Sequence, residues 1–144
     1  MTGYLLDTNC LSLFFNNRAS AAFDEWVERQ HADGRIFVSV ISLQEIEKGG
    51  VKLGATKGGS QTKALDIGRW VRELSVRFAG RVLPVDMTVA LVAGRIEGAA
   101  VARGHTPSLA DVLIGATAEA FDLTVVTLNL RDFKALGVRC EAPL

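Results

Sequence analysis

The chain has 144 residues, the size of one domain that can bury a sizeable core without disulfides or a structural metal. Apolar residues make up 49%, charged residues 22%, and the formal net charge is zero, a balance that excludes disorder as the main state. No apolar run approaches the roughly 18 residues of a membrane span. The first residues show no basic stretch before a long apolar segment, so we expect no signal peptide, and the two cysteines form no metal or disulfide pattern. We therefore expect a single domain over residues 1–144, located in the cytoplasm and not in a membrane.

The neutral total hides a basic segment at residues 47–81, which carries eight basic and three acidic side chains. A local basic face can bind the phosphates of a nucleic acid even when the whole chain is neutral. A solvated helix face with long cationic side chains explains the same pattern. Both interpretations stay open from the sequence.

Strands and helices alternate along the predicted chain. Short apolar runs predict strands at residues 4–6, 36–40, 82–85 and 124–127, and an edge strand at 138–140. Residues 11–15 can form one helical turn, and helices are predicted after Ser20, after Ser42, over residues 64–78, after Asp86 and after Ser108. Glycines at positions 49–59 predict a loop. This alternation is typical of an α/β domain with a mainly parallel sheet.

Polar residues follow the predicted strands where an active crevice is expected. In parallel α/β sheets that crevice lies at the carboxyl ends of the strands. Asp7 follows the first strand, Glu45 lies one turn into the helix after the second, and Asp111 opens a later helix. Crowded carboxylates repel one another unless a cation neutralises them, and oxygen ligands suit Mg²⁺ or Mn²⁺. Such an ion supports hydrolysis or transfer at phosphate.

Each of these acidic residues also has a purely structural interpretation. Asp7 can bond the start of the following helix as a turn residue. Glu45 and Asp111 each come three residues after a serine, the spacing of a capping box. Asp132 falls in a predicted exposed turn, and His105 in an exposed loop. Spacing alone does not decide between these roles and a metal site.

Four segments resemble the sequence blocks of PIN domains, and most closely those of VapC-type (FitB-like) toxins of type II toxin–antitoxin systems. They are residues 5–9, 38–49, 108–118 and 123–133, in the order and at the intervals usual for the family. The resemblance implies a three-layer α/β/α sandwich around a central, mainly parallel sheet of about five strands. It also implies a Mg²⁺- or Mn²⁺-dependent endoribonuclease that acts as the toxin of a VapBC-type module.

The resemblance also assigns roles to individual residues. Asp7, Glu45 and Asp111 match the acids that hold the metal, and Asn129 stands where many members have a fourth acid. An asparagine can ligate through its carbonyl but brings no negative charge, so Asp132 is the candidate to compensate. The supporting positions are Thr8, Asn9 and Thr127. The basic residues nearest the site, and so the candidates for RNA contact, are Lys48 and Arg131.

The same resemblance implies protein partners. A VapB-type antitoxin would lay its C-terminal tail across the cleft and place a basic side chain among the carboxylates. A homodimer and a toxin–antitoxin hetero-oligomer are usual in the family. Leu11, Phe14 and Phe15 are candidates for the dimer surface, and ordinary core is the equal alternative.

Two other function classes are compatible with parts of this sequence. A PIN-like domain that is weakly active or inactive, and only binds RNA or a protein partner, is the main alternative because of Asn129. A haloacid-dehalogenase-like enzyme would need a second acid at the position of Asn9. No G-x-G-x-x-G follows the first strand, which argues against dinucleotide binding.

Overall fold

A five-stranded parallel sheet forms the centre of the computed structural model, which describes residues 3–144. The strand order is β3-β2-β1-β4-β5. β1 (Tyr4–Leu6) lies in the middle, between β2 (Ile36–Ser39) and β4 (Thr124–Val126). β3 (Val82–Leu83) and β5 (Cys140–Glu141) form the edges. All neighbouring strands pair in parallel, as the sequence predicted.

Successive side chains of the central strands enter two different cores. Leu5 and Val125 belong to one buried cluster, and Leu6 and Val126 belong to the other. This alternation follows from the two-residue period of a strand. A strand buried on both faces needs apolar residues at every position, which explains its continuous apolar runs.

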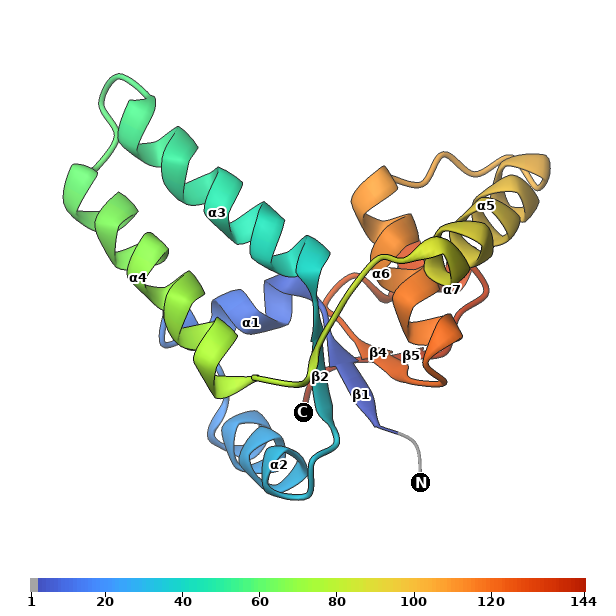
Figure 1. Ribbon diagram of the computed structural model, residues 1–144, viewed down its shortest axis with the longest axis horizontal. Coiled ribbons are helices and arrows are strands. Elements are labelled where there is room, and N and C mark those ends of the chain that lie inside the picture. Colours follow the sequence, from blue (N-terminus) through green and yellow to red (C-terminus); the bar gives the residue numbers. More distant parts are fainter. Residues whose placement is uncertain (1–2) are drawn as a thin grey trace.

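Helices cover both faces of the sheet (Figure 1). The helices on one side are α1 (Thr8–Phe15), α2 (Ala21–Ala32), α3 (Val40–Ala55) and α4 (Gln61–Arg77). Those on the other side are α5 (Met87–Ala102), α6 (Leu109–Ala120) and α7 (Leu130–Ala135). The predicted three-layer α/β/α sandwich is therefore confirmed. No helix within residues 3–144 is long and apolar enough to cross a membrane.

The predicted start of α3 was wrong. Ser39, not Ser42, is the N-cap, and its side chain accepts the backbone N–H of Ile41 at 3.0 Å. The β-branched Val40 looked like a strand residue but begins the helix. Ser42 therefore lies inside the first turn, and Glu45 is not the acid of a capping box.

The glycines of α3 do not form the predicted loop. The helix continues through Gly49, Gly50 and Gly54, and the loop is confined to residues 56–60. A Cβ at Gly50 would lie 2.8 Å from Cγ2 of Ile67, and one at Gly54 would lie 3.1 Å from Cβ of Ala64. The missing side chains let α4 pack closely against α3, and this tertiary gain outweighs the low helix propensity of glycine.

Other boundaries differ by a few residues. α1 begins at Thr8 rather than at Leu11, and Asp132 lies in the short helix α7 rather than in a turn. The third strand ends at Leu83, and the last begins only at Cys140. The helix starts at Ser20, Asp86 and Ser108 are confirmed, since each of these side chains accepts a first-turn N–H.

The apolar side chains of α1 are mostly internal. Leu11 is buried in the core, which rules out a surface role for it. Phe14 and Phe15 are half-buried, and they stack on Phe23 and Trp70 with ring centroids 5.3 and 4.8 Å apart. These contacts favour the core interpretation for the candidate dimer residues.

Two neighbouring glycines test the packing of α3 on α4. We expect Gly50→Ala to lower the melting temperature, because a methyl group there must displace Ile67 and overpacking costs about 1–3 kcal/mol. Gly49 is exposed and its Cβ would meet nothing within 4 Å. Gly49→Ala should therefore raise stability by about 0.5–1 kcal/mol through helix propensity. Thermal unfolding of both variants measures these effects. Equal changes in melting temperature would contradict the close packing of α4 on α3 at Gly50.

Candidate functional site

The candidate site lies where the chain direction across the sheet reverses. From β1 the chain proceeds to β2 and β3 on one side, and it later returns to β4 on the other side of β1. Ligands of open parallel sheets bind at such a switch point, outside the carboxyl ends of the strands. Asp7 extends the ladder here, because its N–H donates to the carbonyl of Val126 at 2.9 Å. Residues after β1 and after β4 are thereby held side by side.

Asp7 is a buried carboxylate with two hydrogen-bond donors. Its side chain is the N-cap of α1, and Oδ1 accepts the N–H of Thr8 at 2.8 Å. Oδ2 accepts the hydroxyl proton of Thr127 at 2.8 Å. The Thr127 hydroxyl in turn accepts the N–H of Asn129 at 2.9 Å. Asp7 therefore does bond the start of α1, as its structural interpretation predicted. Each of its carboxylate oxygens still has a further lone pair for a ligand.

Glu45 reaches the same place from α3. The Thr8 hydroxyl donates to Oε1 of Glu45 at 2.7 Å and is also hydrogen-bonded to Oγ of Ser42 at 2.9 Å. Thr8 therefore joins the start of α1 to the first turns of α3. Ser42 is fully buried, and the sequence suggested for it only an N-cap role. Ser42 and Glu45 have the spacing of a capping box, but in the structure Ser42 is hydrogen-bonded to Thr8.

Asp111 approaches from the opposite layer, in the first turn of α6. Its backbone N–H donates to the N-cap hydroxyl of Ser108 at 3.2 Å, so half of the capping-box interpretation holds. The side chain is half-buried. Burial raises the pKa of the Asp111 carboxyl, the Ser108 hydroxyl lowers it, and the charges of Asp132 and Glu45 raise it.

The three carboxylates act on one another electrostatically. Burial raises the pKa of Asp7 to about 6, although the hydrogen bonds from Thr127 and Thr8 oppose the shift. The charges of Asp111 and Glu45 raise it further. The ion pairs found within residues 3–144 join other acids, namely Asp66, Glu28 and Asp122. None of these ion pairs therefore neutralises the negative charge of the three carboxylates at the carboxyl ends of the strands.

The donor set fits a hard divalent cation held partly through water. Within residues 3–144 no three histidine, cysteine, aspartate or glutamate side chains converge into a ready-made ligand cluster. Mg²⁺ does not require one, since it usually keeps several waters and binds through one or two carboxylates. Asp7 is the candidate for a direct ligand because it is pre-positioned, desolvated and still has free lone pairs. Glu45 and Asp111 lie close enough for their charges to raise the pKa of Asp7.

The remaining predicted residues surround these acids at different depths. Asn9 accepts the N–H of Leu128 through Oδ1 at 3.2 Å, so it ties α1 to the segment after β4. Asn129 is exposed and precedes α7, and its side chain makes no capping hydrogen bond. Asp132 is exposed in the first turn of α7 and acts on Asp111 by charge. Lys48 is exposed on α3, one turn beyond Glu45. Arg131 is exposed on α7 and shares a pocket with Asp111.

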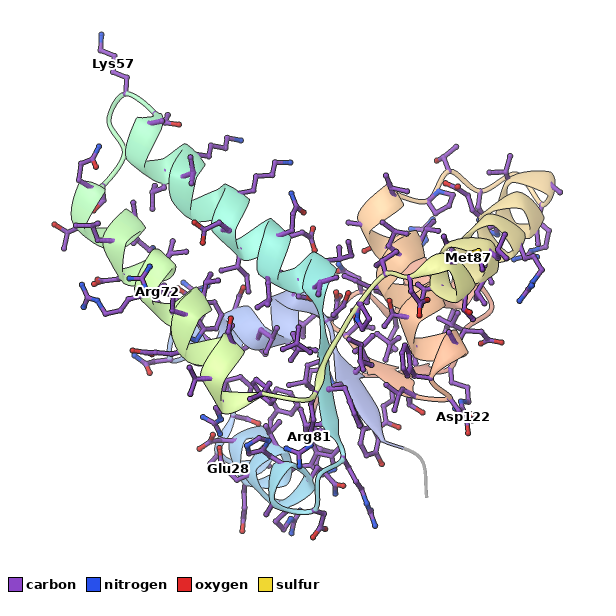
Figure 2. The ribbon with its side chains drawn as sticks, in the orientation of Figure 1. Glu28, Lys57, Arg72, Arg81, Met87 and Asp122 are labelled. Atoms are coloured by element: carbon purple, nitrogen blue, oxygen red, sulfur yellow. The ribbon has the colours of Figure 1, made fainter. Side chains whose placement is uncertain are left out.

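The basic segment of residues 47–81 does not form one patch at these acids. Figure 2 shows Lys57 at the outer tip of the α3–α4 hairpin, Arg72 on α4, and Arg81 at the end of the molecule near α2. Its charges are spread along the hairpin. Only Lys48 follows Glu45 within one turn of α3, so most of the segment matches the solvated-face interpretation.

Cys10 lies near the carboxylates but is not a nucleophile. Burial, and next the charge of Asp7, raise the pKa of its thiol to about 12. The thiol therefore stays protonated at physiological pH, and only a thiolate would attack. The arrangement favours chemistry that uses carboxylates and water.

Comparison with known proteins agrees with this geometry. The model of the PIN domain matches residues 4–138. The chain belongs to the PIN domain family. It is 30% identical over 96% of both chains to Toxin FitB of Neisseria gonorrhoeae, and 28% identical to VapC ribonuclease Y4jK of Sinorhizobium fredii over 93% of this chain and 92% of that protein.

Solved structures of PIN proteins superpose on nearly the whole chain. The FitAcB structure from Neisseria gonorrhoeae matches with a TM-score of 0.78 and 29% identity over 95% of both chains. The DNA-bound VapBC structure from Salmonella typhimurium matches with a TM-score of 0.79 and 26% identity over 99% of this chain and 98% of that chain. The expected family resemblance is thereby confirmed.

The buried charge of Asp7 predicts a pH-dependent stability. Its pKa is about 6 in the folded protein and near 3.8 in the unfolded chain, so this group destabilises the fold as pH rises from about 4 to about 6. Asp7→Asn should therefore raise stability at pH 7.5, by up to about 3 kcal/mol, and the gain should vanish below pH 4. Denaturant unfolding at several pH values measures it.

The exposed Asp24 on α2 supplies the matched control. Asp24→Asn should not give a gain that appears between pH 4 and 6. A wild-type protein as stable as Asp7→Asn at pH 7.5, in the absence of divalent ions, would contradict the burial of an unneutralised charge.

Proposed function

We propose that the chain is a Mg²⁺- or Mn²⁺-dependent endoribonuclease, the toxin of a VapBC-type toxin–antitoxin module, acting in the cytoplasm. The observation that carries this proposal is the desolvated Asp7 carboxylate, flanked by Glu45 and Asp111 at the switch point of a PIN domain. The relative named VapC ribonuclease supports the choice of RNA as the substrate.

The three carboxylates would have different roles in the site. Asp7 and Asp111 would hold the ion, directly or through water, and Glu45 would complete the site. A divalent ion bound there supplies charge that polarises the phosphoryl oxygen and lowers the pKa of a water molecule. Thr127 and Thr8 keep the Asp7 and Glu45 oxygens in place through their hydroxyl groups. Asn129 would contribute a neutral oxygen where a fourth acid is usual in the family.

Glu45 has a free acceptor for the attacking water. One carboxylate oxygen accepts the Thr8 hydroxyl, and the other can accept a hydrogen bond from the water and orient it toward phosphorus. No contact joins His31 or His105 to the three carboxylates, so the proposed mechanism uses no histidine as the base. Lys48 and Arg131 would hold the RNA backbone on either side, which makes binding depend on salt.

An antitoxin partner is part of the proposal. Two of the similar structures are FitAcB and VapBC, the latter bound to DNA. On this chain an apolar pocket of about 160 Å³ lies between α1, α2 and α4, lined among others by Phe14, Trp70 and Phe78. An apolar side chain of a partner could anchor there, while a basic one neutralises the carboxylates. A homodimer and a toxin–antitoxin hetero-oligomer complete the expected assembly.

One observation favours a second candidate function. Asn129 is exposed and uncharged where a fourth acid is usual. Three acids hold a second cation less well than four, because each carboxylate lost removes a ligand charge. A PIN domain that binds RNA or a protein partner without cutting is therefore the alternative.

Cleavage of RNA separates the two functions. We expect the purified, antitoxin-free chain to cut labelled total RNA with Mg²⁺ or Mn²⁺ and to be inactive in EDTA. Asp7→Asn and Asp111→Asn should each lower the rate at least about 100-fold, because removing a group that stabilises transition-state charge costs about 3 kcal/mol. Asp33→Asn, an exposed aspartate at the end of α2, is the control and should keep full activity.

The opposite result is equally informative. If the folded wild type cuts no RNA with either ion, the nuclease proposal fails and the binding function replaces it. If Asp7→Asn cuts as well as wild type, cleavage does not occur at this sheet edge.

A further inference from the structure

A polar pocket lies beside the carboxylates, on the side away from α3. It has a volume of about 750 Å³ and is lined by residues 104–108, by Asp111 and by α7, where the cations Arg131 and Lys134 stand on either side of the acid Asp132. Ligand pockets commonly measure about 300–1,000 Å³. Because Asp111 belongs to both, the pocket adjoins the carboxylate site.

The loop that forms one wall is held at both ends. At the end of α5, the N–H of His105 donates to the carbonyl of Ala100 at 3.0 Å and that of Gly104 to Val101 at 2.9 Å. This is a Schellman motif, and the positive φ of Gly104, 90°, is the conformation it requires. Pro107 restricts the residue before it, and Ser108 caps α6. His105 is therefore presented from a constrained backbone.

The opposite wall is fastened to the same loop region. The side chain of Arg103, the C-cap of α5, donates to the carbonyl of Ala135 on α7 at 2.7 Å. Arg131 and Lys134 are three residues apart on α7, so they share one face of the helix. Both are exposed, and no ion pair found within residues 3–144 includes either of them.

We propose that this pocket binds the nucleotide next to the scissile phosphate of a single-stranded RNA, with Arg131 and Lys134 on its phosphate and His105 on its base. The proposal rests on the proposed ribonuclease function. Two free cations on one helix face suit a phosphate, and imidazole rings stack on unpaired bases. Asp111 and Asp132 also line the pocket and repel phosphate, so binding of the RNA backbone there depends on Arg131 and Lys134.

The pocket also gives His105 a function that its sequence context did not suggest. In the sequence it belongs to an exposed Gly-His-Thr-Pro loop. In the structure it lines the same pocket as Asp111. His105 would then be a specificity-determining residue, because stacking favours an unpaired base over a base within a duplex.

Binding of single-stranded RNA tests the proposal. Fluorescence anisotropy with a labelled oligonucleotide would use chains that all carry Asp7→Asn, so that no cleavage occurs. We expect R131A/K134A to weaken binding about tenfold and to reduce the slope of log Kd against log salt by about 1.4, since each contact to a single-strand phosphate contributes about 0.7. Arg29→Ala, an exposed cation on α2 next to the amino end of β2, is the matched control and should change neither quantity.

The role of His105 has a separate readout. His105→Ala should weaken binding about fivefold or more, and His105→Phe should restore it, because a phenyl ring stacks without charge. In chains with Asp7 intact, R131A/K134A should raise KM for cleavage about tenfold with little change in kcat. Thermal unfolding of each variant is the control, and we expect these exposed substitutions to leave the melting temperature unchanged.

The outcomes separate this inference from the proposed function. If wild type cuts RNA but R131A/K134A matches Arg29→Ala in affinity, salt slope and KM, the pocket is not the subsite and the nuclease function stands. If His105→Phe binds as weakly as His105→Ala, the stacking role is wrong. If wild type neither binds nor cuts RNA, both proposals are overturned.

Discussion

The burial of one unneutralised carboxylate, Asp7, is the constraint around which the site is organised. It lies between the ends of β1 and β4, at 3% exposure, with hydrogen bonds from Thr8 and Thr127. Those bonds offset only part of the desolvation, since the pKa of Asp7 still rises to about 6. The rest of the fold must supply the stability that this charge removes, and the two apolar cores on either side of the sheet do so.

Hydroxyl groups explain how the Asp7 and Glu45 carboxylates are held in place. Thr127, which directly follows β4, holds Asp7, and Thr8 of α1 holds Glu45 and is hydrogen-bonded to the buried Ser42. A hydroxyl donor positions a carboxylate and leaves its charge in place, whereas an arginine would neutralise that charge. The site therefore keeps its net negative charge, which is what a divalent cation or a basic side chain of a partner recognises.

Local periodicity and the order of the elements predicted the parallel sheet and the sheet edge that carries the acids, and the family resemblance added the three layers. It failed where tertiary packing decides. The glycines of α3 predicted a loop, but their small size is what lets α4 pack against that helix. Ser42 matched a capping box, yet Ser39 caps the helix, and local spacing cannot distinguish two serines three residues apart.

The same limit applies to the surroundings of the carboxylates. Asp7 and Asp111 could be singled out because they directly follow or open a predicted element, and Glu45 because it lies one turn into the next helix. The family resemblance assigned the three to one site. His105 and Lys134 could not, since only the folded chain brings the α5–α6 loop against α7. The metal-binding roles of the three acids and the contribution of Asn129 stay predictions, which depend on a bound ion.

The most direct test is a crystal structure of the chain soaked in Mn²⁺, with anomalous diffraction measured at the manganese edge. We expect an anomalous peak at coordination distance, about 2.1 Å, from a carboxylate oxygen of Asp7, on the side facing Glu45 and Asp111. An intact fold with no anomalous peak at this sheet edge, at millimolar Mn²⁺, would contradict the central claim that these carboxylates form a divalent metal site.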